Sequence, residues 1–327
     1  MKKLVFVSIL LALVVIVLGV YTRLTDAGLG CPDWPGCYGH LVVPQDEGLI
    51  EAANAAYPER PVEAQKAWNE MIHRYFAASL GLFILILFVV SLVKRMRGRN
   101  SPIKLPFILL LLVCFQGALG MWTVTLNLLP VVVMGHLLGG FTVLSCLFLL
   151  YLRITPYRIP GGDAQIRNFA KFGTIGIILL VIQIGLGGWT SANYASLACT
   201  ELPICEGTWT SKIDIAGAFS VPEAENYEFG VHSYEERVTM HVAHRFGAIA
   251  VFLYICWLAV ALYKKSSSGL VKRMSTLLVV VLGVQIGLGI SNVVYTLPLS
   301  VAVLHNAVAA CLLLVMILLT YTMYRKY

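Results

Sequence analysis

Charged side chains are scarce in this sequence. Only 13% of its 327 residues are Asp, Glu, Lys or Arg, whereas 58% are hydrophobic, and the mean hydropathy is +0.80. A soluble globular protein of this length is excluded, because so few polar side chains cannot cover its surface. The chain is therefore expected to have lipid as its main solvent.

Long polar stretches are few, and most of the chain consists of eight apolar runs. Each run reaches the roughly 20 residues that a helix needs to cross about 30 Å of hydrocarbon. The predicted spans are residues 4–20, 71–93, 105–126, 131–152, 170–190, 241–263, 272–293 and 299–323. The fold class predicted is an all-α membrane protein with eight transmembrane helices.

A signal-peptide cleavage site is also lacking. The first run follows Lys2 and Lys3 and resembles a secretory signal in that respect. Its apolar core, residues 4–20, is longer than the roughly 7 to 15 residues of a signal sequence, and no clear A-x-A motif follows it. We therefore interpret this run as a transmembrane helix.

The basic residues predict the orientation of the helices. They gather at the N-terminus, after the second, fourth and sixth helices, and in the C-terminal tail. Such residues accumulate on the cytoplasmic side, so we expect both termini to be cytoplasmic. The formal net charge of +7 is then a feature of membrane topology, and no nucleic-acid partner is expected.

An internal duplication relates the two halves of the chain. An offset of 168 residues lays TRLTDAGLGCPDWPGC on TSANYASLACTELPIC, and an offset of 171 lays MIHRYFA on VAHRFGA. The shared spacing predicts two parallel four-helix bundles. They occupy residues 1–153 and 170–327, and residues 154–169 form a cytoplasmic linker.

Four histidines occupy matching places near the outer ends of the even-numbered helices: His73, His136, His244 and His305. An ionisable side chain in apolar surroundings is a functional candidate, although any one alone fits a hydrogen-bonded structural role equally well. Each half offers two imidazoles on different helices, which suits a flat, apolar haem. Zinc or copper usually needs further ligands, and no carboxylate or thiol is repeated nearby. The sequence therefore predicts two bis-histidine haem sites.

The halves differ beside these histidines. Glu70 lies three residues before His73 on the same helical face, and its counterpart is His241. Glu70 has two interpretations, a first-turn acid stabilised by the helix dipole or a general base in an oxidation. We expect Arg74 and Arg245 to pair with haem propionates. Interhelical hydrogen bonds are expected from three glutamines: Gln116, Gln183 and Gln285.

Two cysteine pairs share a C-x5-C spacing in the long outer loops. They are Cys31 with Cys37 and Cys199 with Cys205. An oxidising compartment permits structural disulfides there, while thiol exchange with a partner or reaction with a substrate remains the alternative. No C-x-x-C-H motif is present, so covalent c-type haem is not predicted.

Several short motifs in one order resemble the haem A synthase family across the whole chain. They are TRLTDAGLGCPDWPGC, the E-x-x-H-R of Glu70 to Arg74, GHLLGG around His136, the HR at His244 and LHNA around His305. The resemblance implies an enzyme that oxidises the C8 methyl of haem O to a formyl group, giving haem A for haem-copper terminal oxidases. It implies an oxidoreductase for which water is the expected oxygen source.

The resemblance also implies a role for each site. Haem b would be the cofactor at His244 and His305, with Arg245 beside it. Haem O would be the substrate at His73 and His136, with Glu70 as the catalytic carboxylate. The loop cysteines match family pairs that many members lack in one or both loops.

Two other functions explain the histidines. A di-haem cytochrome b would carry electrons from a quinol, and a haem transporter or chaperone would deliver haem without chemistry.

For the synthase, expected partners are a haem O synthase, terminal oxidase assembly factors and an unidentified electron acceptor, and a homo-oligomer is compatible with the sequence. The expected location is the bacterial plasma membrane, with the haem sites toward the outer side.

Overall fold

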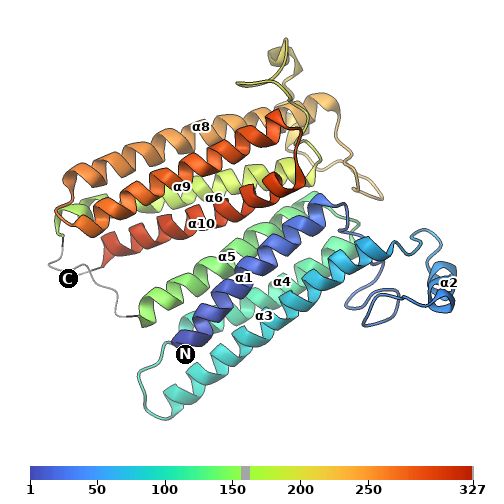
Figure 1. Cartoon of the computed structure of the whole chain (residues 1–327), viewed down its shortest axis with the longest axis horizontal. Helices are drawn as coiled ribbons and strands as arrows, with labels where there is room; N and C mark the ends of the chain where they lie inside the picture. Colours follow the sequence, from blue (N-terminus) through green and yellow to red (C-terminus); the bar gives the residue numbers. More distant parts are fainter. Residues whose placement is uncertain (156–162, 326–327) are drawn as a thin grey trace. The chain divides into compact units, whose positions relative to one another are not determined.

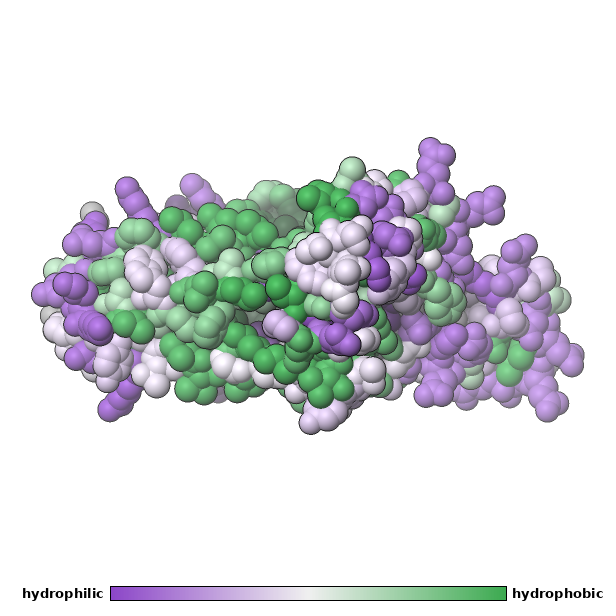
Figure 2. Space-filling model, turned by 90° about the horizontal axis from the view of Figure 1, so that it is seen from above, coloured by the Kyte–Doolittle hydropathy of each residue, from purple (hydrophilic) through white to green (hydrophobic). Residues whose placement is uncertain are grey.

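The computed structural model of the chain describes residues 1–155 and 163–325. Within these residues the regular secondary structure is helical, and no strand forms. Eight of the helices are long and apolar enough to cross a membrane, which confirms the predicted number. Figure 2 shows apolar side chains over the middle of the helices and polar side chains gathered toward their ends.

The long helices follow the predicted runs closely. Their bounds are Lys2–Leu24 (α1), Ala64–Met96 (α3), Lys104–Thr125 (α4), Pro130–Ile154 (α5), Ala170–Ala192 (α6), Tyr234–Lys265 (α8), Gly269–Val294 (α9) and Leu299–Tyr324 (α10). Two of them, α3 and α8, begin seven residues before the predicted apolar runs. At α8 the early start is explained by a capping box, in which Ser233 and Glu236 satisfy each other's backbone amides.

The chain folds into two compact units. The first comprises Met1–Leu150 and Glu223–Val231, so it holds α1, α3, α4 and most of α5 (Figure 1). Helix α2 (Glu47–Ala56) lies in its outer loop. Residues 223–231, which we call the strap, come from the second outer loop and nevertheless pack in this first unit. Nothing in the sequence pattern predicted that placement.

The second unit comprises Tyr151–Pro222 and His232–Tyr327. Helix α6 packs on α8 and α10, and α9 packs on α8 and α10. Three short helical segments complete it: η1 (Gln165–Phe169), η2 (Trp209–Lys212) and α7 (Ile215–Ala218). The expected linker at 154–169 falls partly on residues 156–162, which lie outside the described residues.

Candidate active site

His73 and His136 face each other in the first unit. Their ring centroids are 6.3 Å apart, and the ring planes are nearly perpendicular at 86°. His73 packs against α1 at Gly19, where an added Cβ would lie only 2.9 Å from the ring. A larger side chain at Gly19 would therefore displace the imidazole.

The geometry of this pair fits a bis-imidazole metal centre. Two metal–nitrogen bonds of about 2 Å each, the usual length for imidazole, put the ring centroids about 6 Å apart. The Nδ1 atoms of both rings are buried and make no hydrogen bond among the described residues. Orphaned imidazole nitrogens of this kind are costly unless a ligand completes them. These residues thus suit the iron of a haem.

His244 and His305 both lie in the second unit, and a glutamine contacts each of them. The Gln183 Nε2 lies 3.0 Å from Nδ1 of His244 and donates to the His244 carbonyl at 2.9 Å. The Gln285 Nε2 lies 3.3 Å from Nδ1 and 3.2 Å from Nε2 of His305. Both glutamines bond between helices, as predicted, but their partners are the candidate iron ligands themselves.

Glu70 lies beside His73 and is buried, with an exposed fraction of 5%. One carboxylate oxygen pairs with Arg74 Nη2 at 2.6 Å, and the other accepts the Cys31 backbone N–H at 2.9 Å. Since α3 begins at Ala64, Glu70 lies in the second turn and is not a first-turn acid. The interpretation of Glu70 as a first-turn acid is therefore wrong.

Arg74 joins Glu70 to the first cysteine loop. Its Nη1 donates to the carbonyls of Asp33, Pro35 and Gly36. Cys31 and Cys37 close this loop as a disulfide. The guanidinium therefore holds both the Glu70 carboxylate and the first cysteine loop.

Arg245 binds the second cysteine loop in the same way. It donates to the carbonyls of Cys199, Glu201, Pro203 and Ile204. Cys199 and Cys205 are also joined as a disulfide, so the predicted bond is present in both loops. His241, the counterpart of Glu70, contacts the Ala195 carbonyl through Nδ1 at 3.1 Å. The second site consequently has no carboxylate in the place of Glu70.

Arg74→Met is expected to destabilise the protein strongly. Removing one partner of a buried ion pair leaves the other charge uncompensated, which costs about 3 kcal/mol or more. The pair is well buried, with exposed side-chain fractions of 13% for Arg74 and 7% for Glu70. Thermal unfolding of the solubilised protein measures the loss. Arg95→Met, at an exposed position, is the matched control, and an equal midpoint in the two variants would contradict the buried pairing.

Comparison with known proteins shows the family of this chain. A family model described as COX15-CtaA, cytochrome oxidase assembly protein, matches residues 2–317. The chain belongs to this family. A protein of Shewanella oneidensis named "Heme A synthase" is 49% identical over 98% of this chain and 96% of its own length. Proteins of the same name from Nitrosospira multiformis and Mesorhizobium japonicum are 29% and 28% identical, over 94% of this chain and 88% and 86% of their own lengths.

The structure brings together most of the residues that were predicted for this COX15-CtaA chain. Each histidine pair shares one unit, and Glu70 joins its pair through the predicted helix face. The sequence reasoning missed the glycines that face the rings. Gly187 packs against His244 as Gly19 packs against His73, with 2.9 Å from an added Cβ to the ring in both cases. Gly19 and Gly187 are 168 residues apart, as Cys31 and Cys199 are. This shared offset could have identified both glycines from the sequence.

Proposed function

We propose that this chain is a haem A synthase that oxidises the methyl group of haem O to the formyl group of haem A. The observation that carries this function is the buried Glu70 carboxylate, which lies three residues before His73 of the first pair. In the second half its counterpart is His241, so no carboxylate occupies that position beside His244. The names of the similar proteins agree with it. The two alternatives, a di-haem electron carrier and a haem transporter, receive no support from those names and give Glu70 no role.

The proposed division of labour assigns haem O to His73 and His136 and haem b to His244 and His305. When bound, haem b would supply one-electron transfer away from the reaction site. The side chains of Gln183 and Gln285 contact the rings of the second pair and restrict their orientation, as expected of ligands that retain a resident group. Among the described residues, no glutamine side chain bonds to the Nδ1 atoms of the first pair, which suits a substrate that must leave after reaction.

The proposed reaction balances with water as the oxygen source. A methyl group and one water give a formyl group, four protons and four electrons, and an external acceptor takes the electrons. Glu70 is placed to accept a proton from the attacking water, because an ionised carboxylate keeps free lone pairs beyond its bonds to Arg74 and Cys31. Arg74 fixes the position of that carboxylate and does not itself touch the reacting atoms.

The duplication and topology complete the proposal. Two parallels in backbone conformation support two related bundles. Asp26 and Tyr194, which differ by 168, both have positive φ, at 49° and 53°. Leu128 and Leu297, which differ by 169, both have φ of 61°.

With both termini cytoplasmic, the haem sites and the disulfides would lie toward the outer side of the bacterial plasma membrane. Haem O synthase and oxidase assembly factors are the proposed partners.

Production of haem A in a suitable host tests this function. The gene is expressed in cells that make haem O but no haem A, and the extracted haems are separated by chromatography. We expect haem A or its hydroxylated precursor to appear. Unchanged haem O, in cells whose membranes contain the folded protein, would refute the proposal.

Gln183→Val is expected to weaken haem b binding by about tenfold or more, because loss of a side chain that contacts a metal-bound imidazole typically has that effect. The substitution is taken from the first half of the chain, where Val15 is the counterpart of Gln183. Gly247 makes room for the Gln183 side chain, and its counterpart in the first half is Phe76. Haem retention during dialysis is measured by absorption. Gln165→Val, at an exposed position, is the control, and equal retention in both variants would contradict the role of Gln183.

A further inference from the structure

The strap is anchored in the first unit by a buried tyrosine. Tyr227 is 8% exposed and packs with Leu29, Val124 and Leu128. Its backbone N–H donates to the Asn127 carbonyl at 3.0 Å. Burying a side chain of this size stabilises the contact substantially, since aromatic residues dominate the energetics of cores and interfaces. The strap is therefore a packed element of the first unit.

Asn127 connects the strap to the α4–α5 turn and to Arg60. Its Nδ2 donates to the Glu225 carbonyl at 2.9 Å, and its Oδ1 accepts from Arg60 Nη2 at 3.1 Å. The backbone of Asn127 has φ of 47°, a conformation that asparagine and glycine tolerate better than other residues. One side chain thus bonds to the strap and to the first outer loop together.

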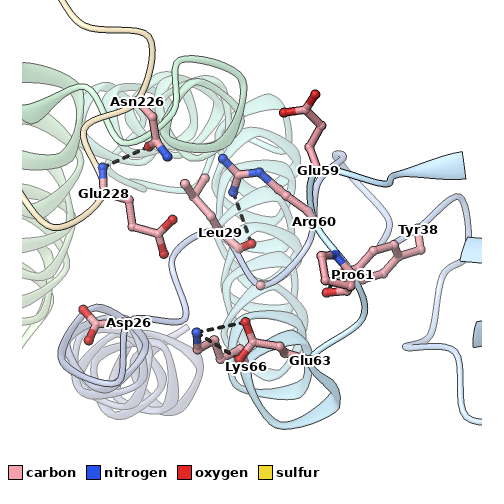
Figure 3. A pocket seen from close by; sticks show the side chains of 11 residues that line it. Asp26, Leu29, Tyr38, Glu59, Arg60, Pro61, Glu63, Lys66, Asn226 and Glu228 are labelled. Atoms are coloured by element: carbon pink, nitrogen blue, oxygen red, sulfur yellow. Dashed lines mark hydrogen bonds and ion pairs between the residues drawn. The ribbon is translucent and has the colours of Figure 1, made fainter. Parts of the chain in front are cut away.

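Arg60 extends the connection toward the cysteine loop. Its Nη1 donates to the Leu29 carbonyl at 3.4 Å. Figure 3 shows Arg60 pointing toward Leu29, with Asn226 and Glu228 of the strap on the facing side of a cavity of about 170 Å³. Tyr38 also lines this cavity and donates to the Pro61 carbonyl, and burial raises the pKa of its phenol.

Leu29 is followed directly by Gly30 and Cys31, which contact the helix and the carboxylate of Glu70. Gly30 lies so close to α3 that an added Cβ would be 2.6 Å from the Lys66 backbone. This close approach brings the Cys31 N–H to the Glu70 carboxylate, at 2.9 Å. An unbroken set of contacts therefore runs from Tyr227 and Asn127 through Arg60 and Leu29 to Glu70.

We propose that the strap is a positioning element of the first site, which keeps the Cys31 amide on the Glu70 carboxylate by holding Leu29 and Gly30 against α3. A loop from one half of the sequence would then complete the reaction site of the other. The effect on turnover rests on the proposed function. The effect on the loop itself does not, because it follows from the contacts alone.

Hydrogen exchange tests the loop independently of activity. Tyr227→Ala removes the anchor, and Asn127→Gly removes both side-chain bonds while tolerating positive φ. We expect the amides of Leu29 to Cys31 to exchange about fivefold faster or more in both variants, because the strap then no longer holds Leu29 against α3. The amides of the Cys199–Cys205 loop are expected to exchange at the wild-type rate. Ala224→Ser, at an exposed position of the strap, is the matched control.

Kinetics then test the consequence for the site. We expect kcat for haem A formation to fall about tenfold in Tyr227→Ala and Asn127→Gly, with little change in KM and with haem b retained. Asn127→Asp keeps the acceptor for Arg60 and is expected to recover most of kcat. A purely structural role would reduce haem b content and kcat together, without recovery in Asn127→Asp.

The outcomes are separable. Wild-type exchange at Leu29 to Cys31 in both Tyr227→Ala and Asn127→Gly would overturn the positioning role, whether or not the protein makes haem A. Faster exchange with unchanged kcat would overturn the link to Glu70. Absence of haem A from the wild-type protein would refute the proposed function, and the exchange rates would still decide whether the strap holds the loop.

Discussion

Glu70→Gln is expected to reduce the kcat of haem A formation by about 100-fold or more, the usual contribution of a positioned general base. Glutamine keeps the size of the side chain and an oxygen that can accept the Cys31 amide, but it cannot take a proton. It also loses the charge that pairs with Arg74 at 2.6 Å. Rates are measured in membranes by following haem O and haem A chromatographically. The absorption spectrum of haem b is expected to stay unchanged.

Glu63→Gln provides the control for this experiment. Glu63 is the residue that precedes the first turn of the same helix, it is exposed, and its carboxylate pairs with the nearby Lys66. Exposed pairs of this kind contribute little, so near wild-type activity is expected. A Glu70→Gln enzyme that matches Glu63→Gln in kcat would remove the carboxylate from the mechanism.

His244→Ala is expected to abolish binding of haem b and, with it, enzymatic activity. An axial imidazole supplies the bond from the protein to the iron, and alanine leaves a void beside Gln183 in its place. The haem content of the purified protein is measured from its absorption and by extraction. The exposed loop histidine gives the control variant, His40→Ala, which is expected to bind haem b normally. Stoichiometric haem b in His244→Ala would contradict the assignment of the cofactor half.

The spans and the histidine pairs were predictable because each depends on a pattern that survives in the sequence. An apolar run of about 20 residues has few alternatives to a membrane helix. The matched positions of His73 and His244 follow from the repeat. The helix starts were less predictable, since the polar first turns of α3 and α8 carry no hydropathy signal.

The contacts of the outer loops could not be predicted, because they join residues far apart in the sequence. Arg74 donates through Nη1 to loop carbonyls, a contact that the sequence did not indicate. The packing of Tyr227 on Leu29 depends on where the second outer loop lies in space. No spacing rule relates these residues, and no counterpart of the strap was available from the repeat.

Two unequal haem sites are the central claim, and the haem content of the purified protein tests it most directly. The wild-type protein and His73→Ala are purified from cells that make both haem b and haem O, and their haems are identified by chromatography and mass. We expect the wild-type protein to hold haem b together with haem O or its oxidised product, and His73→Ala to hold haem b alone. Haem b in both sites of the wild-type protein, or loss of haem b from His73→Ala, would contradict the account.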